Sequence, residues 1–373
     1  MISDRTLNRR RLIMGGVSAS LTTGLFSGLA SPAISGTASV ASQGARRVVL
    51  GDGHILMALA LILDDPVSHL VGWQGDVVLR SASLFEAWVA QAPDLAQVPV
   101  LGQASADSFS TEATVGTAPD LVILGGGYGP GRNAGTLIDR VTDFGAEVLF
   151  VDFYEDPLTN TAPSLRALGR AFGGVAQERA EAFATFYETR VATIQSTLAQ
   201  DTQARPTVLL EAHAGMRGWP CCWIPGGSGL GAFIAAAGGQ HAGESMAPGR
   251  SWVQLQLEAA LTQTPDIYIT TGGPYLSGAS GLAIGPGISA DEARTSLAKA
   301  VLESDLRIGE TLPPENIHGL WHLFHATPLN ILALESLAGW IRPDLFDPAA
   351  SVQLQQQINQ DHLALPLEGT LAI

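Results

Sequence analysis

Two stretches of this chain repeat one pattern, and the repeat constrains the fold more than any other feature. Residues 112–127 and 258–273 align without a gap at a constant offset of 146 residues. Each copy runs from a glutamate through a Pro-Asp pair and a short apolar run to adjacent glycines. Because an internal repeat indicates a repeated structural unit, the sequence predicts two similar lobes.

The chemistry of each copy indicates what the unit is. A carboxylate is favourable at the N-terminal end of a helix, so Glu112 and Glu258 are expected to begin short helices. Pro119 and Pro265 end these helices, because a proline drives the residue before it toward an extended backbone. The apolar runs that follow have the length of buried parallel strands, and the glycines after them allow backbone to approach a bound partner.

Further patterns place more strands and helices around the two copies. Short apolar segments predict strands at 46–52, 70–73, 98–102, 147–152 and 206–213. Helices are predicted at 55–63, 163–171, 176–199 and, as an amphipathic helix, 330–340. The longest of them carries apolar residues at helical spacing, namely Phe183, Phe186, Tyr187, Val191 and Ile194. Strands that alternate with helices indicate parallel sheets.

The predicted fold class is therefore α/β, with two similar α/β lobes of mainly parallel sheets joined by one long spine helix. We assign residues 46–154 to the N-terminal lobe, 155–203 to connecting helices and 204–373 to the C-terminal lobe. Residues 1–41 form a signal peptide and linker.

The N-terminal segment indicates export. Residues 8–13, Asn-Arg-Arg-Arg-Leu-Ile, precede a small and apolar stretch that runs to Ala30. This arrangement is typical of a twin-arginine signal, with candidate cleavage sites at 31–33 and 39–41. A membrane anchor is the alternative, but the glycines and hydroxyls make it a poor span. No lipobox cysteine follows, and no later stretch is long and apolar enough to span a membrane, so we expect a soluble periplasmic protein.

Charge and cysteine content narrow the classes of partner. The formal net charge is −15 and Lys299 is the single lysine, so nucleic acid is not an expected partner, because binding it needs a basic face. The two cysteines, Cys221 and Cys222, are adjacent. A strained disulfide between them and two reduced thiols both remain open. A structural zinc lacks its second pair of ligands.

The order of these features resembles a known family. The export signal, the two lobes, the spanning helix and the Glu-x6-Pro-Asp-strand in both halves are similar to periplasmic substrate-binding proteins for iron–siderophore, haem and vitamin B12 uptake. The second lobe adds a Gly-Gly-Ser-Gly-Leu-Gly pattern at 226–231 and Ala-Gly-Gly at 237–239. The ending adds Trp-His-x-Phe-His-x-Thr-Pro at 321–328, a helix and Arg-Pro-Asp-Leu-Phe at 342–346.

The resemblance implies a monomer that captures a ferric siderophore and delivers it to the permease dimer of an inner-membrane ABC importer. Haem or cobalamin is the alternative ligand, and no covalent cofactor is expected. In that family a glutamate on each lobe docks into arginines of the permease, and the matching residues here are Glu112 and Glu258. A role confined to the helix dipole is the alternative for both glutamates.

The ligand is expected between the lobes, on loops at the strand ends. Arginine suits anionic complexes and aromatic rings cover flat or apolar ligand surface. The candidates on such loops are Trp73, Arg80, Tyr128, Arg132, Trp219, Trp223, Arg250, Trp252, Tyr275 and, from the C-terminal motif, His322. Each of them has a packing or surface role as its alternative.

Three histidines allow a different interpretation of the C-terminal motif, as a metal or haem-iron site. His318, His322 and His325 stand at positions that share one face of a helix, and imidazole suits iron and other metals. The alternative, which we prefer, is a polar wall of the cleft without a metal. An exported cofactor-binding α/β enzyme is the remaining alternative. It lacks support, because the glycine-rich 226–229 segment has no phosphate-loop lysine and no Gly-x-Ser-x-Gly motif occurs.

Overall fold

The structure is a computed structural model that describes residues 46–244 and 248–373. The predicted signal peptide at 1–41 lies outside the described residues. Within the described part, no helix is long and apolar enough to cross a membrane.

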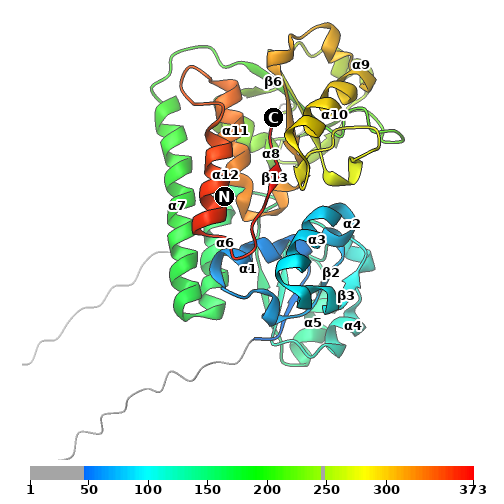
Figure 1. Ribbon diagram of the computed structural model, residues 1–373, viewed down its shortest axis with the longest axis vertical. Coiled ribbons are helices and arrows are strands. Elements are labelled where there is room, and N and C mark those ends of the chain that lie inside the picture. The colour runs from blue at the N-terminus through cyan, green and yellow to red at the C-terminus, as the bar shows by residue number, and fades with distance from the viewer. Residues whose placement is uncertain (1–45, 245–247) are drawn as a thin grey trace, which may run out of the picture. The chain divides into compact units, whose positions relative to one another are not determined.

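The first lobe is built on a five-stranded parallel sheet with the order β3-β2-β1-β4-β5 (Figure 1). Its strands are β1 (Val48–Leu50), β2 (Leu70–Gln74), β3 (Val100–Gly102), β4 (Leu121–Leu124) and β5 (Glu147–Phe150). The helices of this lobe are α1 (Leu56–Ile62), α2 (Asp76–Arg80), α3 (Ala82–Gln91), α4 (Thr111–Gly116) and α5 (Gly135–Asp143). Every residue of β1 and β4 is buried, as expected for parallel strands covered on both faces.

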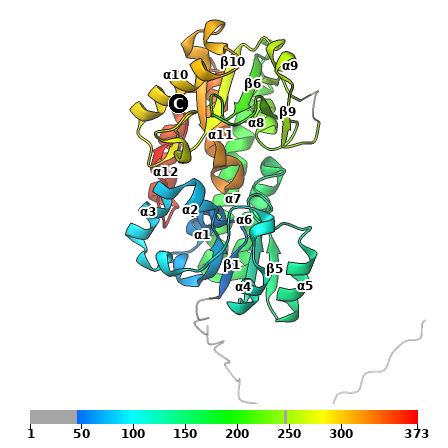
Figure 2. The same ribbon diagram turned by 90° about the vertical axis from the view of Figure 1, so that its right-hand side faces the viewer.

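The second lobe has a mixed sheet with the order β12-β10-β6-β7-β9, and β8 also pairs with β6. The parallel part comprises β6 (Thr207–Ala212), β8 (Gln240–His241), β10 (Ile267–Gly272) and β12 (Ile317–Trp321). The antiparallel strands are β7 (Trp223–Pro225) and β9 (Trp252–Gln254). Figure 2 shows β6, β9 and β10 in this sheet and β1 and β5 in the other. Helices α8 (Leu230–Ala236), α9 (Leu257–Leu261) and α10 (Ala290–Glu303) belong to this lobe.

The sequence repeat occupies equivalent places in the two sheets. Glu112 lies in the first turn of α4, which precedes β4, and Glu258 lies in the first turn of α9, which precedes β10. β4 lies between β1 and β5, and β10 lies between β6 and β12. The predicted α/β class with two lobes is thus confirmed.

Two adjacent helices, α6 (Pro157–Phe172) and α7 (Gly174–Leu198), connect the lobes (Figure 1). α7 packs against α6, against α1 of the first lobe and against α11 (Ile331–Ile341). Phe183, Tyr187 and Ile194 of its apolar face are at most 2% exposed, so the predicted spine helix and its buried face are confirmed. The Arg190 Nε atom donates to Glu335 Oε1 of α11 at 2.7 Å.

Two helix predictions need correction. The helix expected to begin at Pro163 begins at Pro157, because Asp156 caps it by accepting from the Thr159 amide at 3.4 Å. Pro163 therefore lies inside α6.

The helix expected to be amphipathic, α11, has ten of its eleven residues buried, because it packs among α7, α8 and α12 (Ala350–Asp361). A helix that is apolar on all sides is typical of such a core position.

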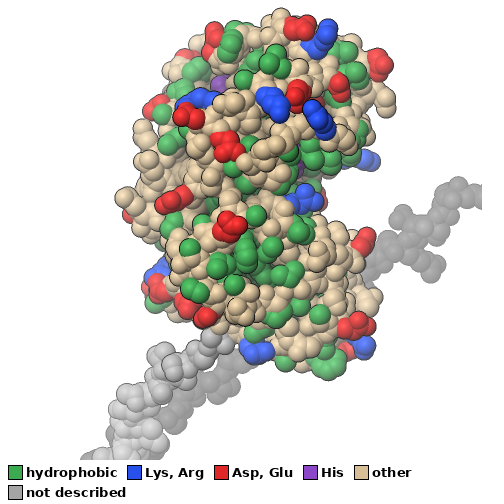
Figure 3. Space-filling view, turned by 45° about the vertical axis from the view of Figure 1, so that its right-hand side comes forward, with side chains coloured by type: hydrophobic (Ala, Val, Ile, Leu, Met, Phe, Trp, Pro, Cys, Tyr) green, Lys and Arg blue, Asp and Glu red, His purple; other side chains and the backbone are tan. Residues whose placement is uncertain are grey.

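The C-terminal segment returns to both lobes. The Ala364 amide donates to the Ala60 carbonyl of α1 at 2.9 Å, and β13 (Gly369–Thr370) pairs with β11 (Gly285–Pro286) of the second lobe. On the face drawn in Figure 3, acidic and basic side chains are scattered among uncharged ones rather than gathered by sign.

Candidate functional site: an aromatic pocket between the lobes

Loops at the strand ends of both lobes enclose a pocket of about 260 Å³. We call it the aromatic pocket, because eight of its lining side chains carry an aromatic or imidazole ring. Its lining residues are Arg80, Gly127, Tyr128, Tyr154, Ala212, His213, Trp219, Trp223, Trp252, Tyr275 and His322. Ligands of open α/β sheets bind at such carboxyl ends of strands.

The structure brings seven of the ten predicted ligand-binding residues together in this pocket. Those seven are Arg80, Tyr128, Trp219, Trp223, Trp252, Tyr275 and His322. The antiparallel strands β7 and β9 each begin with one of these tryptophans, Trp223 and Trp252.

The other three predicted residues lie elsewhere. Trp73 is fully buried in β2, where it packs with Phe85 at 6.0 Å between ring centroids, so its placement on a cleft loop was wrong. Arg132 lines a separate cavity and lies over the Phe150 ring. Arg250 is exposed and lines none of the pockets described here.

Two pocket residues were missed from the sequence. His213 directly follows β6 and Tyr154 follows β5 after a short gap. The predicted strands at 206–213 and 147–152 already indicated both positions, because residues just after parallel strands lie at the ligand-binding edge. The predicted cleft residues included other tyrosines and another histidine, but not these two.

Arg80 supplies the permanent charge among the residues that line the pocket. Its guanidinium carbon lies 5.1 Å from the centroid of the Tyr128 ring, a distance typical of a cation–π contact. Its Nε atom is buried and has no hydrogen-bond partner among the described residues. An uncompensated buried donor of this kind favours an acceptor supplied by a ligand.

His213 is a neutral imidazole at neutral pH. Burial and then the charge of Arg80 lower its pKa to about 4. Its Nε2 atom hydrogen-bonds to the Tyr275 hydroxyl, while its Nδ1 atom is buried without a partner among the described residues. The His322 ring lies 4.4 Å from it between centroids, and His322 Nδ1 bonds to Thr271 Oγ1 at 2.8 Å.

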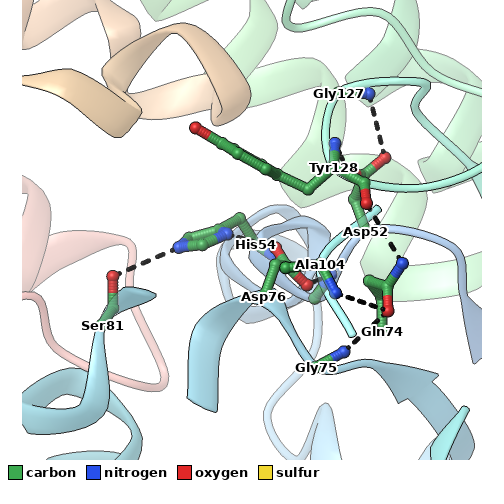
Figure 4. A network of polar contacts seen from close by, with 10 residues as sticks. Asp52, His54, Gln74, Gly75, Asp76, Ser81, Ala104, Gly127 and Tyr128 are labelled. Carbon is green, nitrogen blue, oxygen red and sulfur yellow. Dashed lines mark hydrogen bonds and ion pairs between the residues drawn. The ribbon is translucent and has the colours of Figure 1, made fainter. Parts of the chain in front are cut away.

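A buried polar network supports the first-lobe side of the pocket (Figure 4). Asp52 accepts hydrogen bonds from the backbone amides of Gly127, at 3.3 Å, and of Tyr128. The Gln74 amide donates to the Tyr128 carbonyl at 3.1 Å. These contacts hold the loop after β4 from both sides of the Tyr128 peptide.

The same network reaches the residue next to Arg80. His54 is fully buried, bonds to Asp76 through Nδ1 and lies 3.4 Å from the Ser81 hydroxyl through Nε2. Burial, followed by the charge of Asp76, raises the pKa of Asp52 to about 7. The network thus orients the backbone of Gly127 and Tyr128, which line the pocket, and reaches Ser81 beside Arg80. The side chains of Asp52, His54, Gln74 and Asp76 are buried and do not line the pocket.

The three C-terminal histidines do not share a helix face. His318 lies in β12, where its ring stacks on Trp340 at 4.4 Å, and burial lowers its pKa to about 4. His322 and His325 follow in a short 3-10 helix (His322–Ala326). The helical spacing is interrupted because residues 317–321 pair with β10, so of the two described side chains only His322 reaches the pocket.

The adjacent cysteines form a disulfide, Cys221–Cys222. The Cys221 sulfur lies 3.7 Å from Glu211 Oε1, and these three residues form a cluster of potential metal ligands in the described part of the chain. Because both sulfurs are used in the disulfide, neither is available as a thiolate ligand.

The predicted docking glutamates are both exposed. Neither Glu112 nor Glu258 forms an ion pair with any residue in 46–244 or 248–373. Both carboxylates are therefore available to a partner.

Comparison with known proteins identifies the family. A family model described as periplasmic binding protein matches residues 70–301, which is more than half of the chain. The chain belongs to the periplasmic binding protein family. Members bind substrates for transport and deliver them to ABC importer permeases, so the alternative of an exported enzyme is set aside.

Solved structures share this fold at low sequence identity. The TroA-like periplasmic binding protein FepB from Veillonella parvula has a TM-score of 0.74 at 20% identity, over 89% of this chain and 95% of that chain. A periplasmic haem-binding protein from Pseudomonas aeruginosa has a TM-score of 0.54 at 19% identity, over 80% of this chain and 94% of that chain. These likenesses establish the two-lobe fold.

Among curated proteins, a cobalamin-binding protein from Halobacterium salinarum is 28% identical over 178 residues. The match covers 48% of this chain and 44% of that protein. The matched part is therefore less than half the length of this curated relative.

Proposed function

We propose that this periplasmic binding protein captures an anionic ferric siderophore in the aromatic pocket. The observation that carries the proposal is Arg80, whose buried Nε atom lacks a partner among the described residues while its guanidinium faces a pocket of rings. A carboxylate or catecholate oxygen of the ligand would satisfy that donor through a charge-assisted hydrogen bond. Tyr128, Trp223 and Trp252 would cover the apolar surface of the complex.

Transport follows from reversible binding rather than chemistry. The loops of both lobes would hold the ligand, and Glu112 and Glu258 would present the loaded protein to the two subunits of an inner-membrane permease. The twin-arginine signal would place the monomeric protein in the periplasm, where capture takes place. The domain boundaries proposed from the sequence, at about 154 and 204, fit this arrangement, because α6 and α7 lie between the two sheets.

Haem is a second candidate, supported by a different observation. His213 is a neutral imidazole whose buried Nδ1 atom lacks a partner among the described residues, and a neutral imidazole suits iron. The haem-binding relative from Pseudomonas aeruginosa is similar in fold. Cobalamin, which the relative from Halobacterium salinarum binds, is a third candidate.

Titration of tryptophan fluorescence tests the proposal, because Trp219, Trp223 and Trp252 all line the pocket. The panel contains ferric hydroxamates, ferric catecholates, ferric citrate, haem, cobalamin and Zn²⁺. We expect saturable quenching by one class of anionic ferric complex. Loss of one charge-assisted hydrogen bond in Arg80→Ala should weaken that binding about tenfold or more.

Arg250→Ala is the matched control, because Arg250 is exposed and lies outside the pocket, and it should bind like the wild type. Binding of haem alone, with an absorption spectrum altered by His213→Ala, would replace the siderophore with haem. Binding of cobalamin alone, unaffected by Arg80→Ala, would contradict the anionic-ligand proposal.

A further inference from the structure

A second cavity lies beside the aromatic pocket in the first lobe. Its volume is about 610 Å³, and we call it the polar cavity. It is lined from the ends of β4 and β5 and from α6. Its lining residues include Arg132, Asn133, Phe150, Asp152, Glu155 and Asn160.

The two cavities are neighbours along two segments of the chain. Gly126 lines the polar cavity and Gly127 lines the aromatic pocket. In the same way Glu155 lines the polar cavity and Tyr154 the aromatic pocket. The two cavities therefore share these two segments as a common wall.

The size of the aromatic pocket favours an extension of the ligand into the polar cavity. Its volume of about 260 Å³ lies below the range of roughly 300–1,000 Å³ that is usual for sites of drug-sized ligands. The neighbouring polar cavity is more than twice as large. A bulky iron complex would thus place only part of its volume among the aromatic rings.

The side chains of the polar cavity show which chemistry it would take. The Arg132 guanidinium lies 4.6 Å from the centroid of the Phe150 ring, and neither Arg132 nor Asn133 makes a side-chain hydrogen bond within the described residues. This stacking leaves the N–H edge of Arg132 free to donate. The cavity therefore offers donors to a carbonyl or hydroxyl oxygen.

The carboxylates of the cavity disfavour an anionic arm, and Asp152 is already satisfied by groups of the protein. Asp152 accepts from the amides of Tyr154, Glu155 and Asp156 at 2.9, 2.8 and 3.2 Å and from Asn160 Nδ2 at 2.7 Å. Four bonds fill the acceptor positions of a carboxylate, so Asp152 has none left for a cationic ligand group. One arginine against two carboxylates leaves the lining with a charge of about −1, which disfavours an anionic group.

We propose that the polar cavity is a second subsite, which binds an uncharged, carbonyl- or hydroxyl-bearing arm of the iron complex held in the aromatic pocket. Arg132 and Asn133 donate to the oxygens of this arm, and Asn160 Oδ1 accepts from its N–H or O–H groups. The inference rests on the proposed function and deepens it, because it makes the arm a determinant of specificity. A complex with a peptide-like arm is then preferred over a flat complex whose edge carries carboxylates.

The test uses three synthetic ferric tris-catecholates, which are anionic complexes that differ in one arm. One has no arm, one carries a short peptide ending in a primary amide, and one carries the same peptide ending in a carboxylate. Affinities are measured with the wild type, with Arg132→Gln, and with Ala167→Leu, which narrows the cavity from α6 without removing a polar group. Arg250→Gln is the control for loss of an arginine. Thermal melting of each variant checks that it remains folded.

We expect the wild type to bind the amide-armed probe about tenfold more tightly than the armless one, as expected for one or two hydrogen bonds. Arg132→Gln and Ala167→Leu should each remove most of this advantage and leave affinity for the armless probe unchanged. Arg250→Gln should retain the advantage.

Equal affinity of the wild type for armed and armless probes would overturn the subsite while leaving the proposed function intact. The same conclusion follows if both cavity variants keep the full advantage, or if the carboxylate arm binds better than the amide arm. Failure of all three probes to bind the wild type would contradict capture of an anionic ferric complex, and with it the subsite for an arm of that complex.

Discussion

At the scale of single residues, burial without a counter-charge is the recurring feature of the second lobe. Glu211 in β6 is 4% exposed and accepts hydrogen bonds from the hydroxyls of Tyr268 and Ser304. Burial raises the pKa of Glu211 to about 7, although the hydrogen bonds from both hydroxyls lower it. Nearby His213 shows the reverse shift, because burial of an imidazole favours its neutral, deprotonated form.

The Glu211 shift predicts a pH dependence of stability. Between its ordinary value of 4.5 and about 7 the folded state holds a proton that the unfolded chain has released. The free energy of unfolding therefore falls as pH rises through this interval. Glu211→Gln, which stays neutral, should be more stable than the wild type at pH 8 by on the order of 3 kcal/mol, with little difference near pH 4.5.

Urea unfolding at both pH values measures this effect. Glu303→Gln changes an exposed carboxylate close in space and serves as the control. A stability gain of Glu211→Gln that is equal at pH 4.5 and pH 8 would show that ionisation of Glu211 is not its cause.

At the scale of elements, the connection between the lobes depends on close packing of α6 against α7. A Cβ atom added at Gly169 of α6 would lie 2.5 Å from the Ala180 Cβ and 3.0 Å from the Gln177 Cα of α7. The absence of a side chain at this position is what lets the two helices approach. Arg166 of α6 adds exposed ion pairs to Glu181 and Glu188 of α7, which contribute little by comparison.

Gly169→Val should therefore destabilise the protein by about 1–3 kcal/mol, as expected for overpacking of a tight contact. Gly116→Ala is the matched control, since this helical glycine of α4 has no atom within 4 Å of an added Cβ, and it should be neutral or slightly stabilising. Chemical denaturation of both variants measures the difference. Equal stability of Gly169→Val and wild type would mean that α6 and α7 can move apart without lowering the free energy of unfolding.

At the scale of the whole molecule, the repeat places one exposed glutamate on each lobe, at the start of α4 and of α9. The helix dipole accounts for each carboxylate alone, but it contributes only about 0.3–1 kcal/mol. The proposed docking to a permease with two copies of the same surface would account for the pair, because complementary charges steer and orient such encounters.

The double variant Glu112→Ala/Glu258→Ala should keep the ligand affinity of the wild type and lose most uptake in cells. Glu178→Ala, an exposed carboxylate of α7 outside the repeat, should leave uptake unchanged. Uptake of a radiolabelled iron complex and fluorescence titration of the purified variants measure the two properties separately. Normal uptake by the double variant would rule out docking through these glutamates.

Features that depend on local sequence could be predicted, whereas features that depend on contacts between distant segments could not. The repeat, the spine helix and the strand ends could be predicted, because each depends on local patterns of proline, glycine and apolar residues. His318 shows where such reasoning fails: a spacing that fits a helix lies partly in β12, because pairing with β10 overrides the local pattern. Trp73 shows the same limit, since neighbours on both faces of β2 decide its burial.

The sequence by itself determined the α/β class, the two lobes and most of the residues that line the aromatic pocket. Only the tertiary structure decided that Arg80 and Arg132 lie in different cavities and that His213 faces Tyr275. The physical reason is that a cavity is formed by segments distant in sequence, and their separation in space depends on how helices and sheets pack. Local propensity carries no information about that separation.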